Sequence, residues 1–407
     1  MNKDRQKQDV NTRLALISLM ISTFAIGTTE FIIMGILPDV AKDLNVSISS
    51  TGLLVTGYAI GVAIGAPLLT ALTGKMQRKK LLLMLMLLFV IGNTLCAVAP
   101  TYEFLLVSRV LAAFAHGTFF GVGSVVASRL VPPEKQSSAV AMIFTGVSVA
   151  NIIGVPLGTF VGQSLGWRAS FWIISALGVV AILCITKFIP QIALTSVPSF
   201  RQEIRVLKKP QVQLTLLMTI LSFVGVFAAF TYIAPTLTDI TKFSASAITP
   251  ILLLYGLGLT IGNTVAGRLS DWKPMPTIIG MLALLTLVMG SFYITSEYKI
   301  LAVITVFLWG FTSFGHVPGL QMRVIAKAKG APNIAASLNI SAFNFGIALG
   351  SFVGGVVINT SLGLKAIPLI AALLTVLCIG VVLVGWLFDS KEEKQVQVNQ
   401  DLKIKNA

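Results

Sequence analysis

The sequence predicts an all-α membrane protein, with twelve transmembrane helices in two pseudo-symmetric six-helix bundles. Three observations support this fold class: few charged residues, long apolar runs that recur along the whole chain, and a resemblance between its two halves. Of the 407 residues, 55% are hydrophobic and only 11% are charged, whereas roughly a quarter of the residues of a soluble protein are charged. The lipid bilayer is therefore an expected partner of this chain.

The apolar runs have the length that a helix needs to cross a bilayer, roughly 20 residues each. Because hydrocarbon offers no hydrogen bonds, each run must pair its own backbone, as a helix does. The runs are also too long and continuous to be strands of a membrane barrel. The twelve runs cover about 14–37, 51–73, 80–99, 102–130, 138–162, 168–188, 212–235, 247–269, 276–295, 299–322, 334–358 and 364–388.

The basic residues predict the orientation in the membrane. If the N-terminus is cytoplasmic, 24 of the 30 Lys and Arg residues fall in cytoplasmic segments, five fall in outer loops, and Arg109 lies within a span. Cytoplasmic segments of membrane proteins carry this excess of positive charge. We therefore expect a multi-pass protein of the cell (inner or plasma) membrane with both termini cytoplasmic. The net charge of +15 then has an explanation without a nucleic-acid partner.

The sequence offers no constellation for catalysis or for metal binding. Cys96, Cys184 and Cys378 are scattered through the apolar runs, which suits neither a disulfide framework nor a thiolate metal site. We find no phosphate-binding loop, no G-x-S-x-G and no pair of His residues at ligand spacing. We expect no metal, no cofactor and no enzymatic activity.

The longest polar interval between runs, 191–211, divides the chain into two halves that share a register. At an offset of 197 positions, Tyr58 falls on Tyr255, Gly61 on Gly258, Gly65 on Gly262 and Pro38 on Pro235. Two six-helix repeats related in this way are typical of transporters that bind substrate between the repeats. The predicted organisation is an N-terminal bundle, a cytoplasmic linker, a C-terminal bundle and a polar cytoplasmic tail, covering 1–190, 191–211, 212–390 and 391–407.

Two loops resemble the cytoplasmic signature of the major facilitator superfamily, roughly G-x-L-x-D-R-x-G-R-R. The second loop reads GRLSDWKP and contains Arg268 and Asp271, the signature acid; the first reads GKMQRKK, with Gly74 in place of the acid and Arg78 at the basic end. The resemblance implies that the acid contacts a helix end across the two halves and biases one conformation. For the basic residues of the first loop, a signal for membrane orientation alone is an equal alternative.

Two further motifs resemble the drug:proton antiporter branch of that superfamily, which has twelve spans. The fourth run contains Arg109 at the position of a buried arginine, and the fifth contains Gly154, Pro156 and Gly158 in a G-x-x-x-G-P-x-x-G-like segment. The segments GTTEFIIMGILP and GWRASF are similar to those of bacterial arabinose, sugar and purine efflux permeases. Proline bends a helix and glycine allows close helix approach, so we expect the fifth run to move, with a static kink as the alternative.

Glu30 is the one acid that we place in the body of a predicted span. A carboxylate there costs free energy and usually faces a cavity or a partner. Loss of solvation disfavours its charged form, so it can take up and release a proton near neutral pH. At helical spacing it shares a face with Thr23, Gly27 and Met34, which we expect to line the central cavity. The alternative is a structural carboxylate that never titrates.

Arg109 and His116 are seven residues apart and therefore share one face of the fourth run, at a separation of about 10 Å. Arginine keeps its charge in proteins, and histidine titrates near physiological pH. With Glu30 they form the predicted proton-coupling set. For His116, a single hydrogen bond in a tight helix contact is an alternative that we favour slightly.

The second half is predicted to supply the walls of a substrate cavity. The seventh run has Phe223, Phe227 and Thr231 on one stripe, the eleventh has Asn339 and Phe343, and His316 lies beside the helix-breaking Pro318 in the tenth. Apolar and aromatic walls with a few polar groups are typical of small-molecule sites. Each of these aromatic residues on its own is more simply explained by packing.

Together these features predict a monomeric secondary transporter that exports a small molecule, drug-like, sugar or purine, in exchange for protons. The proton gradient would be its energy source, and alternating access its mechanism. An uncoupled facilitator or importer of a small solute is the alternative within transport. A membrane sensor without transport is a further alternative, although the short loops and tails leave no domain for signalling output.

Overall fold

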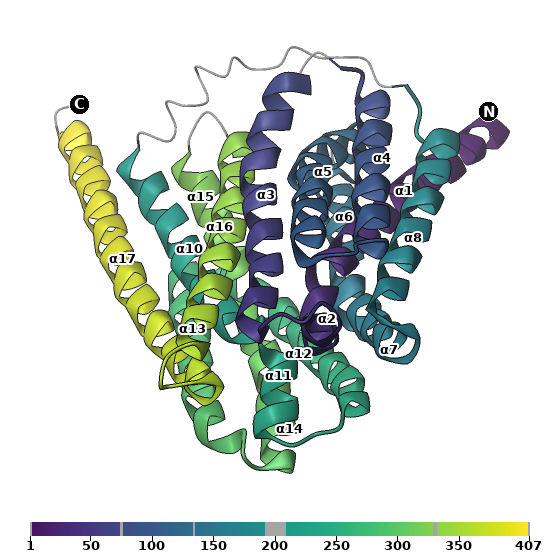
Figure 1. Cartoon of the computed structure of the whole chain (residues 1–407). Helices are drawn as coiled ribbons and strands as arrows, with labels where there is room; N and C mark the ends of the chain where they lie inside the picture. The colour runs from purple at the N-terminus through teal and green to yellow at the C-terminus, as the bar shows by residue number, and fades with distance from the viewer. Residues whose placement is uncertain (1, 74–75, 133–134, 192–208, 329–331, 406–407) are drawn as a thin grey trace.

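The computed structural model describes residues 2–73, 76–132, 135–191, 209–328 and 332–405, and nearly all of them lie in helices. Within these residues, twelve helices are long and apolar enough to cross a membrane, as the sequence predicts. Both ends of the chain lie on one side of the helical bundle, at the top of Figure 1. We call this side the terminal face and the other side the far face.

The first half consists of helices that precede residue 190. Its elements are α1 (Asn2–Gly35), α2 (Leu37–Asp43), α3 (Ile48–Thr73), α4 (Arg78–Ala97), α5 (Tyr102–Arg129), α6 (Gln136–Val149), the π-helical turn η2 (Ala150–Gly154), α7 (Val155–Leu165) and α8 (Trp167–Phe188).

The second half begins after the predicted linker, of which 192–208 lie outside the described residues. Its elements are α10 (Pro210–Phe230), α11 (Ile233–Pro235), the π-helical turn η3 (Thr236–Ile240), α12 (Ala245–Trp272), α13 (Pro274–Thr295), α14 (Lys299–Ser313), α15 (Val317–Lys327), α16 (Pro332–Ile358), the short 3₁₀ helix η4 (Leu364–Ala366) and α17 (Ile367–Lys405). The division of the chain at 191–211 stays a prediction.

Proline explains where three spans are interrupted. The fifth span changes from α6 to the π-helical turn just before Pro156, and the tenth breaks between Ser313 and Val317, ahead of Pro318. The seventh turns at Thr231 and Tyr232 and continues to Ile240, beyond the end that the hydrophobicity predicts. Because proline has no N–H to donate to the preceding turn, the helix loosens there.

The two halves meet through α3 and α16 on the far face. Ser49 donates a hydrogen bond to the Gly355 carbonyl at 2.8 Å, and Ser351 donates one to the Gly52 carbonyl at 2.8 Å. A Cβ atom added at Gly52 would overlap the hydroxyl of Tyr232. The absence of a side chain at Gly52 is therefore what allows the two halves to pack this closely.

Candidate transport site

Glu30 lies in α1 with only 5% of its surface exposed. Its Oε2 atom is 4.0 Å from Nε2 of His116 on α5. Its Oε1 atom is buried and has no hydrogen-bond partner among the described residues. A buried carboxylate oxygen without a partner is costly while the group is charged, which makes this carboxyl group suited to hold a proton.

Arg109, also on α5, is fully buried beside the same part of α1. Its Nη1 donates to the backbone carbonyl of Thr29 at 2.6 Å, and its Nη2 lies 3.5 Å from the carbonyl of Glu30. The guanidinium carbon is 4.3 Å from the ring centroid of Tyr58. The guanidinium is therefore held by backbone oxygens and an aromatic face, and it places a fixed positive charge next to Glu30.

His116 connects this pair to α3. The hydroxyl of Tyr58 lies 3.4 Å from Nδ1 of His116, whose ring also packs on Phe120 with centroids 5.1 Å apart. Tyr58, His116 and Glu30 thus form a row of titratable or hydrogen-bonding groups across α3, α5 and α1. Tyr58 is a site residue that the sequence did not predict, although its shared register with Tyr255 was a signal that it mattered.

The other residues of the Glu30 stripe contact the fifth span. Thr23 donates to the carbonyl of Ile143 at 2.7 Å, and a Cβ added at Gly27 would lie 3.1 Å from that of Ala150. Met34 is buried as well. The structure therefore places Thr23 and Gly27 in the contact between α1 and the fifth span, which α6 and η2 form here.

The glycines of the predicted antiporter motif pack on α1 on either side of Glu30. A Cβ added at Gly154 would overlap the hydroxyl of Thr28, and one added at Gly158 would overlap the side chain of Ile32. Pro156 lies between them, at the start of α7. A change in the shape of the fifth span would thus act directly on the helix that positions Glu30.

The second half contributes an aromatic cluster, which we define as Phe223, Phe227, Phe314, Phe343 and His316. The ring centroids of Phe223 and Phe343 are 4.2 Å apart, and those of Phe223 and His316 are 5.6 Å apart. His316 is fully buried at the break between α14 and α15, and neither of its ring nitrogens has a hydrogen-bond partner among the described residues.

Phe31 links the aromatic cluster to the proton-coupling set. It directly follows Glu30 on α1, and its ring stacks on Phe227 of α10 with centroids 6.0 Å apart. The structure therefore brings four of the predicted cavity residues, namely Phe223, Phe227, His316 and Phe343, close to the helix that contains Glu30.

Two predicted cavity residues have local partners instead. Thr231 donates to the carbonyl of Phe227 in its own helix at 2.8 Å. Asn339 accepts a hydrogen bond from Thr219 and donates one to Gln321, both at 2.7 Å. Their polar groups are satisfied by the protein, so they contribute less to a site than His316 does.

The predicted conformational latch is not formed in the part of the chain that the structure describes. Asp271 and Arg268 are exposed on the last turns of α12, and Asp271 has neither a hydrogen bond nor an ion pair there. Arg78 is half-buried at the start of α4, and Gly74 lies outside the described residues. The role of these loops stays a prediction.

The family model of the Major Facilitator Superfamily matches residues 19–336, more than half of the chain. This chain belongs to the major facilitator superfamily. The sequence resemblance is thus confirmed at the level of the family, and the chain is a transporter and not an enzyme.

Relatives and solved structures agree with this assignment. An inner membrane transport protein, YdhP of Escherichia coli O157:H7, is 43% identical over 358 residues, which cover 88% of this chain and 92% of that protein. A chloramphenicol resistance protein of Streptomyces lividans is 35% identical and covers 86% of this chain and 90% of its own length. The crystal structure of a D-xylose–proton symporter matches this fold with a TM-score of 0.75 at 15% identity, covering 91% of this chain and 96% of that one.

Proposed function

We propose that this transporter exports a small molecule from the cytoplasm in exchange for protons, by alternating access, with Glu30 as the proton carrier. Both termini are then cytoplasmic and the protein lies in the cell membrane, as the distribution of Lys and Arg indicates. The observation that carries the proposal is the carboxyl group of Glu30, buried within a span with Oε1 unpaired and Oε2 4.0 Å from His116. An ionisable group at that depth is a functional group by default.

The neighbours of Glu30 suit both of its protonation states. When the carboxylate is charged, the fixed charge of Arg109 stabilises it, because Coulomb attraction is strong where water is excluded. When it is neutral, the carboxyl group has a low cost of burial and moves through an occluded state more easily. His116, whose Nε2 is 4.0 Å from Oε2 of Glu30, can take up the proton that Glu30 releases and later return it, while the hydroxyl of Tyr58 lies 3.4 Å from its other ring nitrogen.

The aromatic cluster is the proposed contact surface for substrate. Its rings offer apolar faces, and His316 adds a buried imidazole with no partner in the described protein. Such walls with one polar anchor suit a compound with an apolar ring surface and a hydrogen-bonding group. The relative named as a chloramphenicol resistance protein supports export of drug-like molecules over import of sugars.

The test is active efflux in proteoliposomes with an imposed pH difference. Glu30→Gln keeps the shape of the side chain and its ability to form hydrogen bonds, but it cannot titrate. We expect this variant to insert normally and to lose uphill efflux, while downhill exchange of substrate survives. The matched control is Glu103→Gln, which neutralises an exposed acid in the first turn of α5. Pumping by Glu30→Gln at the wild-type rate would return Glu30 to a structural role.

The same assay separates the proposal from uncoupled transport. If wild-type flux of substrate is independent of the pH difference, and Glu30→Gln matches it, the protein is a facilitator. If no member of a panel of drugs, sugars and purines is transported under any gradient, the sensor alternative gains support.

A further inference from the structure

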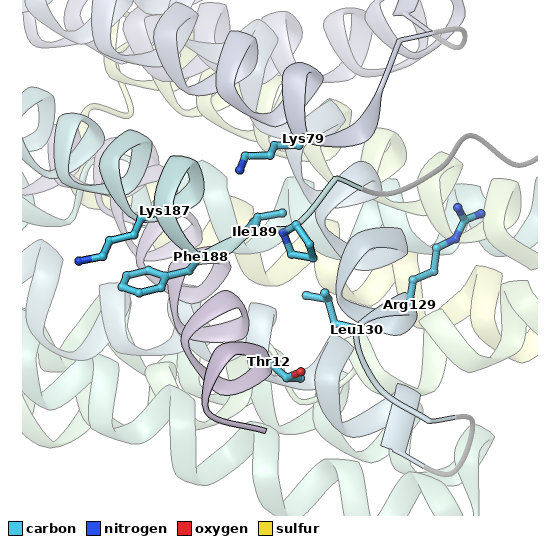
Figure 2. Close-up of a pocket in the computed structure, with 8 residues that line it drawn as sticks. Thr12, Lys79, Arg129, Leu130, Lys187, Phe188 and Ile189 are labelled. Carbon is cyan, nitrogen blue, oxygen red and sulfur yellow. The ribbon is translucent and has the colours of Figure 1, made fainter. Parts of the chain in front are cut away.

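A cavity of about 530 Å³ lies at the terminal face of the first half, away from the transport site. It is formed by residues of α1, α4, α5 and α8 and of the segment that follows α8; Figure 2 shows Lys79 above Ile189, with Lys187 and Arg129 on opposite sides of the group. We call it the basic pocket. Its volume falls within the roughly 300–1,000 Å³ that is usual for small-molecule sites. Thr12 and Pro190 complete its lining.

Among the described residues, those that line the basic pocket include the three cations Lys79, Arg129 and Lys187 and no acid. The ammonium group of Lys79 donates to the backbone carbonyl of Thr186 at 2.8 Å, which leaves its other two N–H groups to serve a ligand. Arg78 precedes Lys79 and adds a further positive charge at the start of α4. Its buried Nε has no hydrogen-bond partner among the described residues. A concentration of like charge in a partly enclosed site favours an anion.

The sequence explains why this site is basic. The first loop lacks the acid of the family signature, because Gly74 stands in its place, and it keeps the cations Arg78 and Lys79. Orientation in the membrane requires positive charge on this face, but it does not require the charges to surround a cavity. The convergence of the ends of α4, α5 and α8 on one pocket is therefore a second observation, independent of the count of charges.

The depth of the pocket points to a lipid. Arg129 and Phe188 are the last residues of their membrane-spanning segments, so the pocket lies at the level where phospholipid headgroups lie. Next to it, Leu183 is 63% exposed one turn before Lys187, and Leu87 is 52% exposed two turns after Lys79. These apolar side chains offer a surface for acyl chains.

We propose that the basic pocket binds the phosphate group of an anion, and that an anionic phospholipid of the surrounding membrane supplies it. Lysine binds phosphate as a point charge, and basic pockets between spanning helices accept anionic headgroups. The bound headgroup bridges Lys79 and Lys187 and so ties the ends of α4 and α8 together. The site is separate from the export proposal and stands if that proposal fails.

The test measures thermal unfolding of the full-length protein in detergent with added phosphatidylglycerol, phosphatidylcholine or inorganic phosphate. The test variant is Lys79→Gln/Lys187→Gln, and the charge-matched control is Lys273→Gln/Lys299→Gln, two exposed lysines outside the pocket. We expect phosphatidylglycerol to raise the unfolding temperature of the wild type and of the control by several degrees. The test variant should lose most of this shift, and phosphatidylcholine should produce little of it.

The phosphate arm identifies the source of the anion. If inorganic phosphate alone reproduces the shift and the test variant abolishes it, the ligand is a soluble phosphate compound and the lipid assignment is wrong. If phosphatidylglycerol stabilises the test variant as strongly as the wild type, the basic pocket binds no phosphate group and the proposal is overturned. Lys79→Arg/Lys187→Arg, which keeps both charges, should retain the shift, and this shows that a loss in the Gln variant reflects charge and not misfolding.

Discussion

At the scale of single residues, two of the side chains with unpaired buried polar atoms belong to the proposed transport site. Oε1 of Glu30 and both ring nitrogens of His316 are buried without a partner among the described residues. A buried polar group without a hydrogen bond costs about 1–3 kcal/mol. Apolar residues at these positions would avoid that cost. The presence of Glu30 and His316 is explained most simply if a proton or a substrate pairs with them during the transport cycle.

His316→Leu tests this explanation in the second half. Because the substitution removes two unpaired nitrogens from an aromatic environment, we expect the free energy of unfolding to hold or to rise, by up to about 1–3 kcal/mol. Affinity for substrate should fall by up to about tenfold, which corresponds to one hydrogen bond of roughly 1.4 kcal/mol. Thermal unfolding and substrate binding are measured side by side. His316→Gln, which keeps a hydrogen-bonding group, is the control, and unchanged affinity in the Leu variant would exclude a contact with substrate.

Features of the site that lie within a single helix could be predicted from the sequence, whereas contacts between helices could not. Glu30 is recognisable as an acid within a span, and Arg109 and His116 as a pair on one face, because helical period fixes which side chains share a face. Period does not reveal which helix lies opposite that face. For this reason Thr23 and Gly27 were expected at a cavity although they contact α6, and the partners Tyr58 and Phe31 were not predicted.

At the scale of elements, the fifth span is the part most closely fitted to the Glu30 helix. Gly158→Ala places a Cβ against Ile32, so we expect a loss of about 1–3 kcal/mol in the free energy of unfolding, the usual cost of overpacking. Transport should slow while substrate binding stays detectable, because the wider side chain hinders movement of α7 past α1. Gly121→Ala, in open space on α5, is the control. If binding and transport fall together, the motif has a structural role only.

The link between α2 and α8 gives a prediction about pH. Arg168 and Trp167 donate hydrogen bonds to Asp43 at 2.5 and 3.0 Å, and both hold the pKa of this carboxyl group below its usual value. A lowered pKa stabilises the folded state above the unfolded value of about 3.9, and the contribution is lost as pH falls through the folded value. Because the pair is largely exposed, it contributes at most about 1 kcal/mol.

Asp43→Asn removes that contribution. We expect the wild type to unfold at a slightly higher temperature than this variant at pH 7, and the difference to shrink as the pH is lowered below about 4. Unfolding is followed by intrinsic fluorescence across this range at constant ionic strength. A difference that stays constant down to the lowest pH would mean that ionisation of Asp43 does not stabilise this end of the protein.

At the scale of the whole molecule, composition and repetition were sufficient to predict the fold, since twelve apolar runs and a shared register are properties of the entire chain. The interruptions at Pro156 and Pro318 were also readable, because proline acts on its own helix. The contact between the two halves could not be predicted from the sequence. This contact depends on the hydroxyls of Ser49 and Ser351 and on the missing side chain of Gly52. Small residues of these types occur wherever membrane helices pack, so the sequence does not distinguish these three from others.

We expect the far-face contact between α3 and α16 to open during alternating access, because it joins the two halves on that side. Ser49 and Asn359 lie on opposite halves, with Nδ2 of Asn359 donating to Oγ of Ser49 at 3.1 Å. In a background without Cys184, we expect Ser49→Cys/Asn359→Cys to lose transport when treated with a short disulfide-forming cross-linker. A reductant should restore it, because the link joins the halves without altering either bundle.

A matched pair within one half provides the control for this experiment. Ser47 and Ser50 lie at the start of α3, with their hydroxyl oxygens 2.9 Å apart. Cross-linking Ser47→Cys/Ser50→Cys modifies the same region of the far face but leaves the two halves free to separate, so transport should continue. If both cross-linked variants lose transport, the reagent obstructs the path of the substrate and does not act by preventing the halves from separating. If neither does, α3 and α16 stay together throughout the cycle, and the far face opens between other helices, such as α7 and α12.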